Sequence, residues 1–201
     1  MKPKIKICGI TNIEDALLAE SLGADFIGLI FASQSPRCVD TQTALNITKE
    51  LTSAKPVGVF VEHSFEETHR IAEQIGLWGI QHYSYFEDVF EGFKYIFASR
   101  LGAPDTPTDF SSLSNDYLLL DTYDKTKHGG TGQTFDWSRI PKSVDKSRLV
   151  LAGGLAPENI CAAARENSFA LDLSSSVEAH PGKKDPQKLK QLFDNLRDYR
   201  T

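Results

Sequence analysis

The stretch Phe26-Ile27-Gly28-Leu29-Ile30-Phe31 (FIGLIF) is a short, uninterrupted run of apolar residues. A half-exposed strand alternates apolar and polar residues, whereas a strand buried on both faces of a parallel sheet is continuously apolar. Seven further runs share this character: Ile5–Cys8, Val57–Val61, Gly79–Tyr83, Tyr95–Ala98, Tyr117–Leu120, Leu149–Ala152 and Phe169–Leu173. The sequence therefore predicts eight buried, parallel strands.

The segments between the runs carry helix signals. Four of them have a polar cap or a proline at the start and a plausible end: Asn12 to Gly23, Ser64 to Gly76, Pro157 to Glu166, and Pro186 to about Tyr199. Residues 101–115 contain two prolines and many small polar residues, so we expect little helix there. Strands that alternate with helices form parallel sheets through right-handed crossovers.

The eightfold strand and helix rhythm favours one architecture. The 201 residues divide into about 25 per unit, close to the lower size limit of a (β/α)8 barrel. We predict an α/β fold in which residues 1–201 form a single (β/α)8 TIM barrel, with the helix after the fifth strand short or irregular. An open doubly wound sheet is the alternative, but eight similar strands without a clear edge strand favour closure.

Composition excludes several classes of protein. Asp and Glu number 27 against 22 Lys and Arg, so the net charge is −5, and no basic patch for nucleic acid or a membrane surface stands out. Nothing approaches the roughly 18–20 apolar residues of a membrane span. Three scattered cysteines, Cys8, Cys38 and Cys161, form neither a disulfide framework nor a zinc motif. We expect a cytoplasmic protein with free thiols that holds any anionic ligand through local groups.

The last two runs are followed by a candidate phosphate site. In a closed parallel barrel the active site lies at the carboxyl ends of the strands, often with phosphate near the last two. Gly153-Gly154 leaves backbone N–H groups bare, and Ser174-Ser175 adds hydroxyls. The alternative is a helix-entry turn with capping serines. The loop Gly129–Gly132 is a further phosphate contact, a lid, or only a turn.

Two residues at strand ends are candidates for proton transfer. Cys8 ends the first run, and Asp121 directly follows the sixth. A thiolate can act as a base and a carboxyl group as an acid, provided that their pKa values suit the task. A strand cysteine is also commonly only a small buried residue. Arg37 has the geometry to pair with a carboxylate, although an exposed arginine is by default solvated.

At this point the chain resembles a known family over nearly its whole length. The motifs that carry the resemblance are Lys6–Thr11, Gly28–Phe31, Ser35–Arg37, Val57–Phe60, Leu119–Asp121, Gly129–Trp137, Gly153–Leu155, Pro157–Asn159, Asp172–Ser175 with Val177-Glu178, and Pro181–Asp185. They are similar to those of the phosphoribosylanthranilate isomerases of tryptophan biosynthesis, which are (β/α)8 barrels.

The resemblance implies an aldose–ketose isomerase. The reaction is the Amadori rearrangement of N-(5-phosphoribosyl)anthranilate to 1-(2-carboxyphenylamino)-1-deoxyribulose 5-phosphate, with Asp121 as general acid and Cys8 as general base. It also implies substrate-binding roles, namely the anthranilate carboxylate for Arg37, a sugar hydroxyl for Asp172, and the phosphate for Gly130, Gly153, Gly154, Ser174 and Ser175. No metal or other cofactor is required. The expected partner is a small phosphosugar substrate, with no nucleic acid or membrane, and the protein is expected to be a monomer or a homodimer.

The chain departs from the family pattern at several positions. The fourth run of the family typically ends Gln-Leu-His-Gly, whereas here it reads Gln81-His82-Tyr83-Ser84, so His82 is expected to point away from the barrel mouth and Tyr83 to replace it. Ser176 stands where the family has glycine, and Phe97 where it often has lysine.

Two other functions stay open at the level of sequence. One is a related phosphosugar isomerase of histidine biosynthesis, although that family has aspartate at the position of Cys8. The other is a catalytically weak barrel that binds a phosphorylated metabolite, and the departures in the fourth, fifth and eighth strands motivate it.

Overall fold

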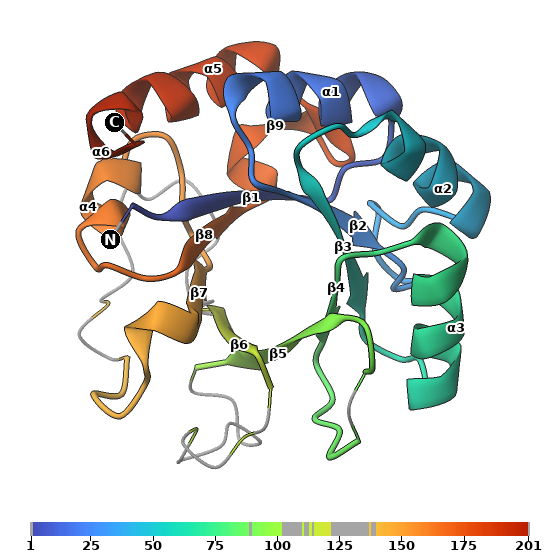
Figure 1. The fold of residues 1–201 in the computed structure, drawn as a ribbon. Coiled ribbons are helices and arrows are strands. Elements are labelled where there is room, and N and C mark those ends of the chain that lie inside the picture. The colour runs from blue at the N-terminus through green and yellow to red at the C-terminus, as the bar shows by residue number, and fades with distance from the viewer. Residues whose placement is uncertain are drawn as a thin grey trace.

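Eight parallel strands close into a barrel in the computed structural model, which describes residues 2–88, 90–101, 110, 113, 115–121, 137 and 140–200 (Figure 1). Each strand pairs with the next along the chain, and the last pairs with the first. The strands are β1 (Lys4–Cys8), β2 (Phe26–Ile30), β3 (Lys55–Phe60), β4 (Gly79–His82), β5 (Lys94–Arg100), β6 (Tyr117–Asp121), β7 (Leu149–Ala152) and β8 (Ala170–Leu173). All eight predicted strands and their closure are confirmed.

The described helices lie on the outside of the barrel (Figure 1). They are α1 (Ile13–Leu22), α2 (Thr41–Glu50), α3 (Phe65–Ile75), α4 (Ile160–Ala164), α5 (Pro186–Asn195) and α6 (Arg197–Arg200). The predicted caps of α1 and α3 are confirmed, because Asn12 accepts from the Asp15 N–H at 2.9 Å and Ser64 forms its capping box with Glu67. Helix α2, capped by Asp40, was not among the predicted helices.

Two predicted helices differ from the observed ones. Helix α4 begins after Asn159 rather than at Pro157, since Asn159 holds the preceding turn by accepting from the Ala156 N–H and donating to the Gly154 carbonyl. The C-terminal helix is divided into α5 and α6 at Leu196. A short 3-10 turn, η2 (Lys146–Arg148), also precedes β7.

The alternation of strand and helix is interrupted between β4 and β5. The described residues there, 83–88 and 90–93, contain turns and no helix. Aromatic side chains cover the barrel instead: Phe90 stacks on Phe65 of α3 with ring centroids 4.3 Å apart, and Phe86 contacts both rings. Nearly all of 101–115, including the helix expected to be short or irregular, and the loop Gly129–Gly132 lie outside the described residues.

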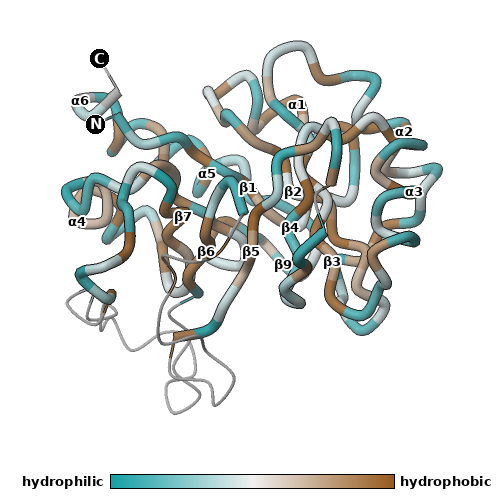
Figure 2. Tube along the Cα trace, turned by 60° about the horizontal axis from the view of Figure 1, so that its bottom comes forward, coloured by the Kyte–Doolittle hydropathy of each residue, from teal (hydrophilic) through white to brown (hydrophobic). Residues whose placement is uncertain are grey.

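The barrel has an outer and an inner core. Figure 2 shows hydrophilic and hydrophobic residues alternating along helices such as α3, which bury their apolar side against the strands. The inner core consists of the side chains that face the barrel axis, and its buried apolar members include Phe26, Val57, Ile96, Ala98, Leu119, Val150, Ala152 and Ala170. The barrel interior is therefore packed between its two ends, as expected for this fold.

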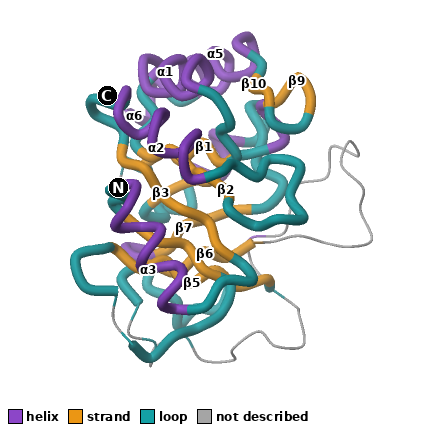
Figure 3. Tube along the Cα trace, turned by 90° about the vertical axis from the view of Figure 1, so that its right-hand side faces the viewer, coloured by secondary structure: helices purple, strands orange, loops and turns teal. Residues whose placement is uncertain are grey.

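A two-stranded hairpin follows β8 and was not predicted. A 3-10 turn, η3 (Ser175–Val177), leads into β9 (Glu178–His180), which pairs antiparallel with β10 (Lys183–Lys184). The hairpin is fastened to α1, because Asp15 accepts from the Lys183 ammonium and from the Lys184 N–H, both at 2.7 Å. Helices α1 and α5 lie side by side next to it (Figure 3).

Among the described residues, no helix has both the length and the apolar character that a membrane crossing requires.

The packing of β3 against the helices predicts a contrast between two neighbouring residues. Phe60 is fully buried and stacks on Phe31 at 4.9 Å, so Phe60→Ala is expected to lower the free energy of unfolding by about 3–5 kcal/mol. Val61 is 43% exposed, so Val61→Ala is expected to change it by no more than about 0.5 kcal/mol. Urea unfolding of both variants measures the difference, and equal losses would contradict this account of the core.

Candidate active site

The strand register determines which side chains face the barrel axis. Neighbouring residues across a parallel ladder point to the same side, and Cys8 is paired with Gly28 while Lys6 is paired with Asp172. On the far side of the ring, Asp121 is paired with Arg100 and Ala152. Leu119 faces inward, and Asp121 lies two residues further along the same strand, so it faces inward too. Cys8 and Asp121 therefore both face the interior at the carboxyl ends of their strands.

Cys8 is a buried free thiol at the end of β1, only 6% exposed. Burial raises the pKa of this thiol because a thiolate loses its hydration there, and the charge of Asp172 raises it further. The positive charges of Lys6 and Lys184 act in the opposite direction. Among the described residues, formation of the Cys8 thiolate is therefore favoured only by the nearby cations, against burial and the charge of Asp172.

Tyr83 occupies the barrel mouth near both candidate proton-transfer groups. It packs against the inner core, and the Arg100 guanidinium lies 5.5 Å from its ring. Burial raises the pKa of Tyr83 to about 12, with further contributions from the negative charges of Asp121, Cys8 and Asp172. Its phenol is thus a neutral hydrogen-bonding group at neutral pH, within electrostatic reach of all three.

His82 points away from the mouth, as the one-residue shift predicted. Its side chain is fully buried outside the barrel, stacked on Phe60. The ring Nε2 lies 3.1 Å from the His63 carbonyl oxygen, and Nδ1 accepts from the Ser84 N–H at 2.8 Å. Burial lowers the pKa of His82, which makes it a neutral core residue.

Arg37 lies over the carboxyl end of β1 rather than in solvent. A Cβ added to Gly9 would meet the Arg37 Cδ at 2.5 Å, so the arginine crosses directly above the residue after Cys8. Its Nε and Nη2 donate to the two carboxylate oxygens of Glu178 at 2.8 and 2.7 Å. A guanidinium held in this way by two parallel bonds has a fixed orientation.

Glu178 and Lys184 join the hairpin to the strand ends. Lys184 donates to Glu178 at 2.9 Å, to the Cys8 carbonyl at 2.7 Å and to the Ser174 carbonyl at 3.2 Å. Glu178 is buried, which by itself raises the pKa of its carboxyl, but its hydrogen bonds with Arg37 and Lys184 outweigh burial and lower that pKa. Glu178 is therefore the charged centre that holds Arg37 in place.

The candidate phosphate residues lie on two adjacent loops, since β7 pairs with β8. Gly153 and Gly154 have φ values of 84° and 65°, and a Cβ added to Gly154 would have no heavy atom within 4 Å. Ser175 is exposed at the start of η3, and the Ser174 Oγ lies 3.2 Å from the position a Cβ of Gly9 would take. Gly130 lies outside the described residues.

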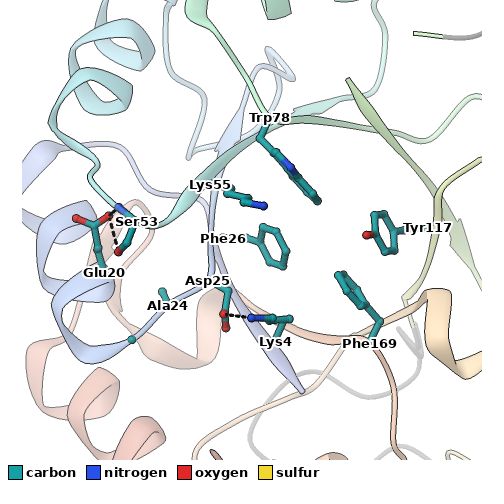
Figure 4. Close-up of a pocket in the computed structure, with 11 residues that line it drawn as sticks. Lys4, Glu20, Ala24, Asp25, Phe26, Ser53, Lys55, Trp78, Tyr117 and Phe169 are labelled. Atoms are coloured by element: carbon teal, nitrogen blue, oxygen red, sulfur yellow. Dashed lines mark hydrogen bonds and ion pairs between the residues drawn. The ribbon is translucent and has the colours of Figure 1, made fainter. Parts of the chain in front are cut away.

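A cavity of about 480 Å³ opens at the opposite end of the barrel (Figure 4). Its inner wall consists of four rings in contact, Phe26, Trp78, Tyr117 and Phe169, and Tyr117 stacks on Phe169 at 4.3 Å. Lys55 lies 5.1 Å from the Trp78 ring. These rings form a floor beneath the inner core, and the titratable groups described above lie beyond that core, at the other end.

Within the part of the chain that the structure describes, no group of three or more His, Cys, Asp or Glu side chains is placed to hold a metal ion.

Sequence reasoning did not identify Lys6, Glu178 or Lys184 as parts of the site. A signal for Lys6 existed, because it is a charged residue two positions before Cys8 in an otherwise apolar run and so shares its face. Glu178 and Lys184 lie in a polar segment without periodicity, and their partnership depends on the hairpin.

Comparison with known proteins gives a consistent result. A family model described as N-(5'phosphoribosyl)anthranilate (PRA) isomerase matches residues 5–195. The N-(5'-phosphoribosyl)anthranilate isomerase of Citrifermentans bemidjiense is 37% identical, with 94% of this chain and 95% of that protein covered. That of Pseudomonas fluorescens strain Pf-5 is 42% identical, with 96% and 94% covered.

Solved structures agree. The phosphoribosyl anthranilate isomerase of Thermus thermophilus matches with a TM-score of 0.82 and 34% identity, covering 97% of this chain and 98% of that one. A phosphoribosyl anthranilate isomerase in complex with reduced 1-(o-carboxyphenylamino)-1-deoxyribulose 5-phosphate matches with a TM-score of 0.74 and 33% identity, covering 98% and 99%.

Proposed function

The chain belongs to the N-(5'-phosphoribosyl)anthranilate isomerase family, whose members are isomerases of tryptophan biosynthesis. From this premise we propose how its residues carry out the reaction. The substrate is an aminoaldose and the product an aminoketose. The rearrangement needs a proton delivered to the ribose ring oxygen and a proton removed from C2. One observation carries the assignment of these tasks: Cys8 and Asp121 face the same barrel mouth from different strands.

Asp121 is the general acid in this proposal. It protonates the ribose ring oxygen, the bond from that oxygen to C1 breaks, and a Schiff base forms between C1 and the anthranilate nitrogen. Its position as the last residue of β6 places the carboxyl group where the strand opens into the mouth. The neutral Tyr83 phenol nearby can hydrogen-bond the substrate without competing as an acid.

Cys8 is the general base. Its thiolate takes the proton from C2, and the electron pair moves through C1 to the nitrogen. The resulting enolamine becomes the ketone when C1 gains a proton and the C2 hydroxyl loses one. Positioned acid and base groups each contribute rate factors of roughly 10²–10⁴. The two groups act at different atoms of one substrate, which is why their placement on separate strands is useful.

Arg37 holds the anthranilate carboxylate, with Glu178 fixing its orientation. Glu178 occupies one edge of the guanidinium, and the remaining N–H groups of Arg37 are available for the substrate. Asp172 bonds Lys6 through Oδ1, so its other oxygen is the one we assign to a sugar hydroxyl.

The phosphate group is assigned to Gly153, Gly154, Ser174 and Ser175. The support is the open space at Gly154 and the adjacency of the two loops. Backbone N–H groups can bind an anion without any net positive charge, which suits a chain of charge −5. The role of Gly130 stays a prediction.

Residues 1–201 act as one cytoplasmic domain in this proposal, as a monomer or a homodimer. Free thiols at Cys8, Cys38 and Cys161 support a reducing compartment.

Loss of either proton-transfer group is expected to lower kcat strongly while leaving binding nearly intact. The substrate is generated in situ from anthranilate and phosphoribosyl pyrophosphate, and its loss of fluorescence is followed. Cys8→Ala and Asp121→Asn should each lower kcat by about 10²–10⁴, whereas Cys38→Ser, at an exposed thiol, should not. Full turnover by both active-site variants would refute the roles, and a wild type that binds product without turnover would favour the catalytically weak barrel.

Removal of the carboxylate anchor is expected to act mainly on KM. A hydrogen bond between charged groups contributes about 1.5–3 kcal/mol, so Arg37→Met should raise KM by roughly 10–150-fold. Glu178→Gln should shift KM in the same direction by a smaller factor, because Arg37 remains but loses its fixed orientation. Steady-state kinetics measure both, with exposed Arg70→Met on α3 as control. An unchanged KM in Arg37→Met would assign the carboxylate to another group.

A further inference from the structure

A lysine lies inside the barrel wall beside the proposed base. Lys6 is on β1, two residues before Cys8 and on the same face, and only 1% of it is exposed. Its Nζ lies 3.0 Å from Oδ1 of Asp172, which is the neighbouring inward-facing residue of β8. A buried charge is costly unless it is paired, so the pairing explains how the lysine is tolerated there but not what it does.

The neighbouring strand β2 leaves an empty space beside Cys8, because it has glycine at the paired position. Gly28 of β2 is paired with Cys8, and a Cβ added to it would lie 2.9 Å from the Cys8 Sγ and 3.1 Å from the Lys6 Nζ. The thiol and the ammonium therefore approach the same point, and only glycine leaves that point empty. An alanine at this position would displace one or both groups, because 2.9 Å is shorter than carbon and sulfur approach each other without bonding.

The charges around Cys8 explain why such a cation is needed. From its own strand Cys8 faces Lys6, from β8 it faces Asp172, and from β10 Lys184 approaches its carbonyl. Among the described residues, Arg37 and Tyr83 also interact electrostatically with Cys8, and Glu178 pairs with Lys184. Burial and Asp172 raise the pKa of the Cys8 thiol, and Lys6 is the foremost of the groups that lower it.

Lys6 itself is poorly suited to act as the base. Burial disfavours its ammonium form and is the largest single effect, but the charges of Asp172 and Cys8 and the hydrogen bonds with them together outweigh burial and raise the pKa of Lys6. The side chain therefore stays protonated across the range in which a thiol titrates. A fixed positive charge next to a thiol favours the thiolate.

We propose that Lys6, held by Asp172 in the space left by Gly28, is a positioning residue that stabilises the Cys8 thiolate for removal of the C2 proton. The proposal rests on the proposed function for the identity of the proton that Cys8 takes. The ammonium gives up no proton in this step: the thiolate gains the C2 proton, and the Lys6–Asp172 pair remains as it was. Lys6 acts through Cys8 and does not touch the reacting carbon.

The test is a titration of the Cys8 thiol without substrate. In a Cys38→Ser/Cys161→Ser background Cys8 is the single thiol, and the ultraviolet absorbance of its thiolate reports its titration, with the Cys8→Ser form as the blank. Lys6→Met should move this titration upward by about 1–3 pH units. The ascending limb of the pH profile of kcat/KM should move in the same direction.

Asp172→Asn separates the effect of the Lys6 charge on the Cys8 titration from the effect of disrupting the buried Lys6–Asp172 pair. It removes a neighbouring negative charge and leaves the lysine, so the thiol should titrate at the wild-type pH or lower, opposite to Lys6→Met. If Lys6→Met fails to fold because Asp172 is left unpaired, Lys6→Met/Asp172→Asn leaves no buried lone charge and should still titrate above wild type.

A titration within a few tenths of a pH unit of wild type, in folded Lys6→Met or in the double variant, would overturn the proposal. Failure of the proposed function looks different. If the titration of the Cys8 thiol shifts as expected in the variants but the wild-type protein shows no isomerase turnover, the Lys6 inference is upheld and the role of Cys8 in the reaction is refuted.

Discussion

The site depends on one constraint: along each strand of the closed barrel, side chains point alternately inward and outward, and the strand pairing fixes which ones point inward. The last two residues of each strand therefore point to opposite sides. Because the ring closes, the pairing registers of all eight strands must be mutually consistent. Lys6 and Cys8 are two apart and both face inward, whereas the adjacent His82 and Tyr83 divide between the helix layer and the mouth. A histidine displaced by one residue thereby becomes part of the core, and a tyrosine takes its place near the proposed acid and base.

Buried charges give this mouth its chemistry at a cost to stability. Removing one partner of a buried ion pair commonly costs about 3–5 kcal/mol, while replacing both with apolar residues is often neutral. The Lys6–Asp172 pair is therefore better explained by what it does to Cys8 than by stability. The cluster of Arg37, Glu178 and Lys184 works similarly, because it fixes an arginine above β1. In the proposed function, local cations of this kind let a chain of net charge −5 bind an anionic substrate.

The sequence was sufficient to predict the strands and to place Cys8 and Asp121 at the carboxyl ends of two of them. Continuous apolar runs reveal doubly buried strands, and Cys8 and Asp121 could be located simply because they end such runs. The partners could not be predicted in the same way. Glu178 meets Arg37 across 141 positions of sequence, through a hairpin that has no periodic signal. The described residues between β4 and β5 form no helix, and Phe86 and Phe90 cover the barrel there through tertiary packing.

The most direct measurement is a crystal structure of this chain with reduced 1-(o-carboxyphenylamino)-1-deoxyribulose 5-phosphate, the ligand of a related solved complex. The account predicts the Cys8 Sγ within about 3.5 Å of C2. It also predicts the Asp121 carboxyl within hydrogen-bonding distance, roughly 2.5–3.0 Å, of the hydroxyl oxygen that was the ring oxygen. A ligand whose C2 and former ring oxygen both lie far from these two groups would contradict the division of acid and base between β6 and β1.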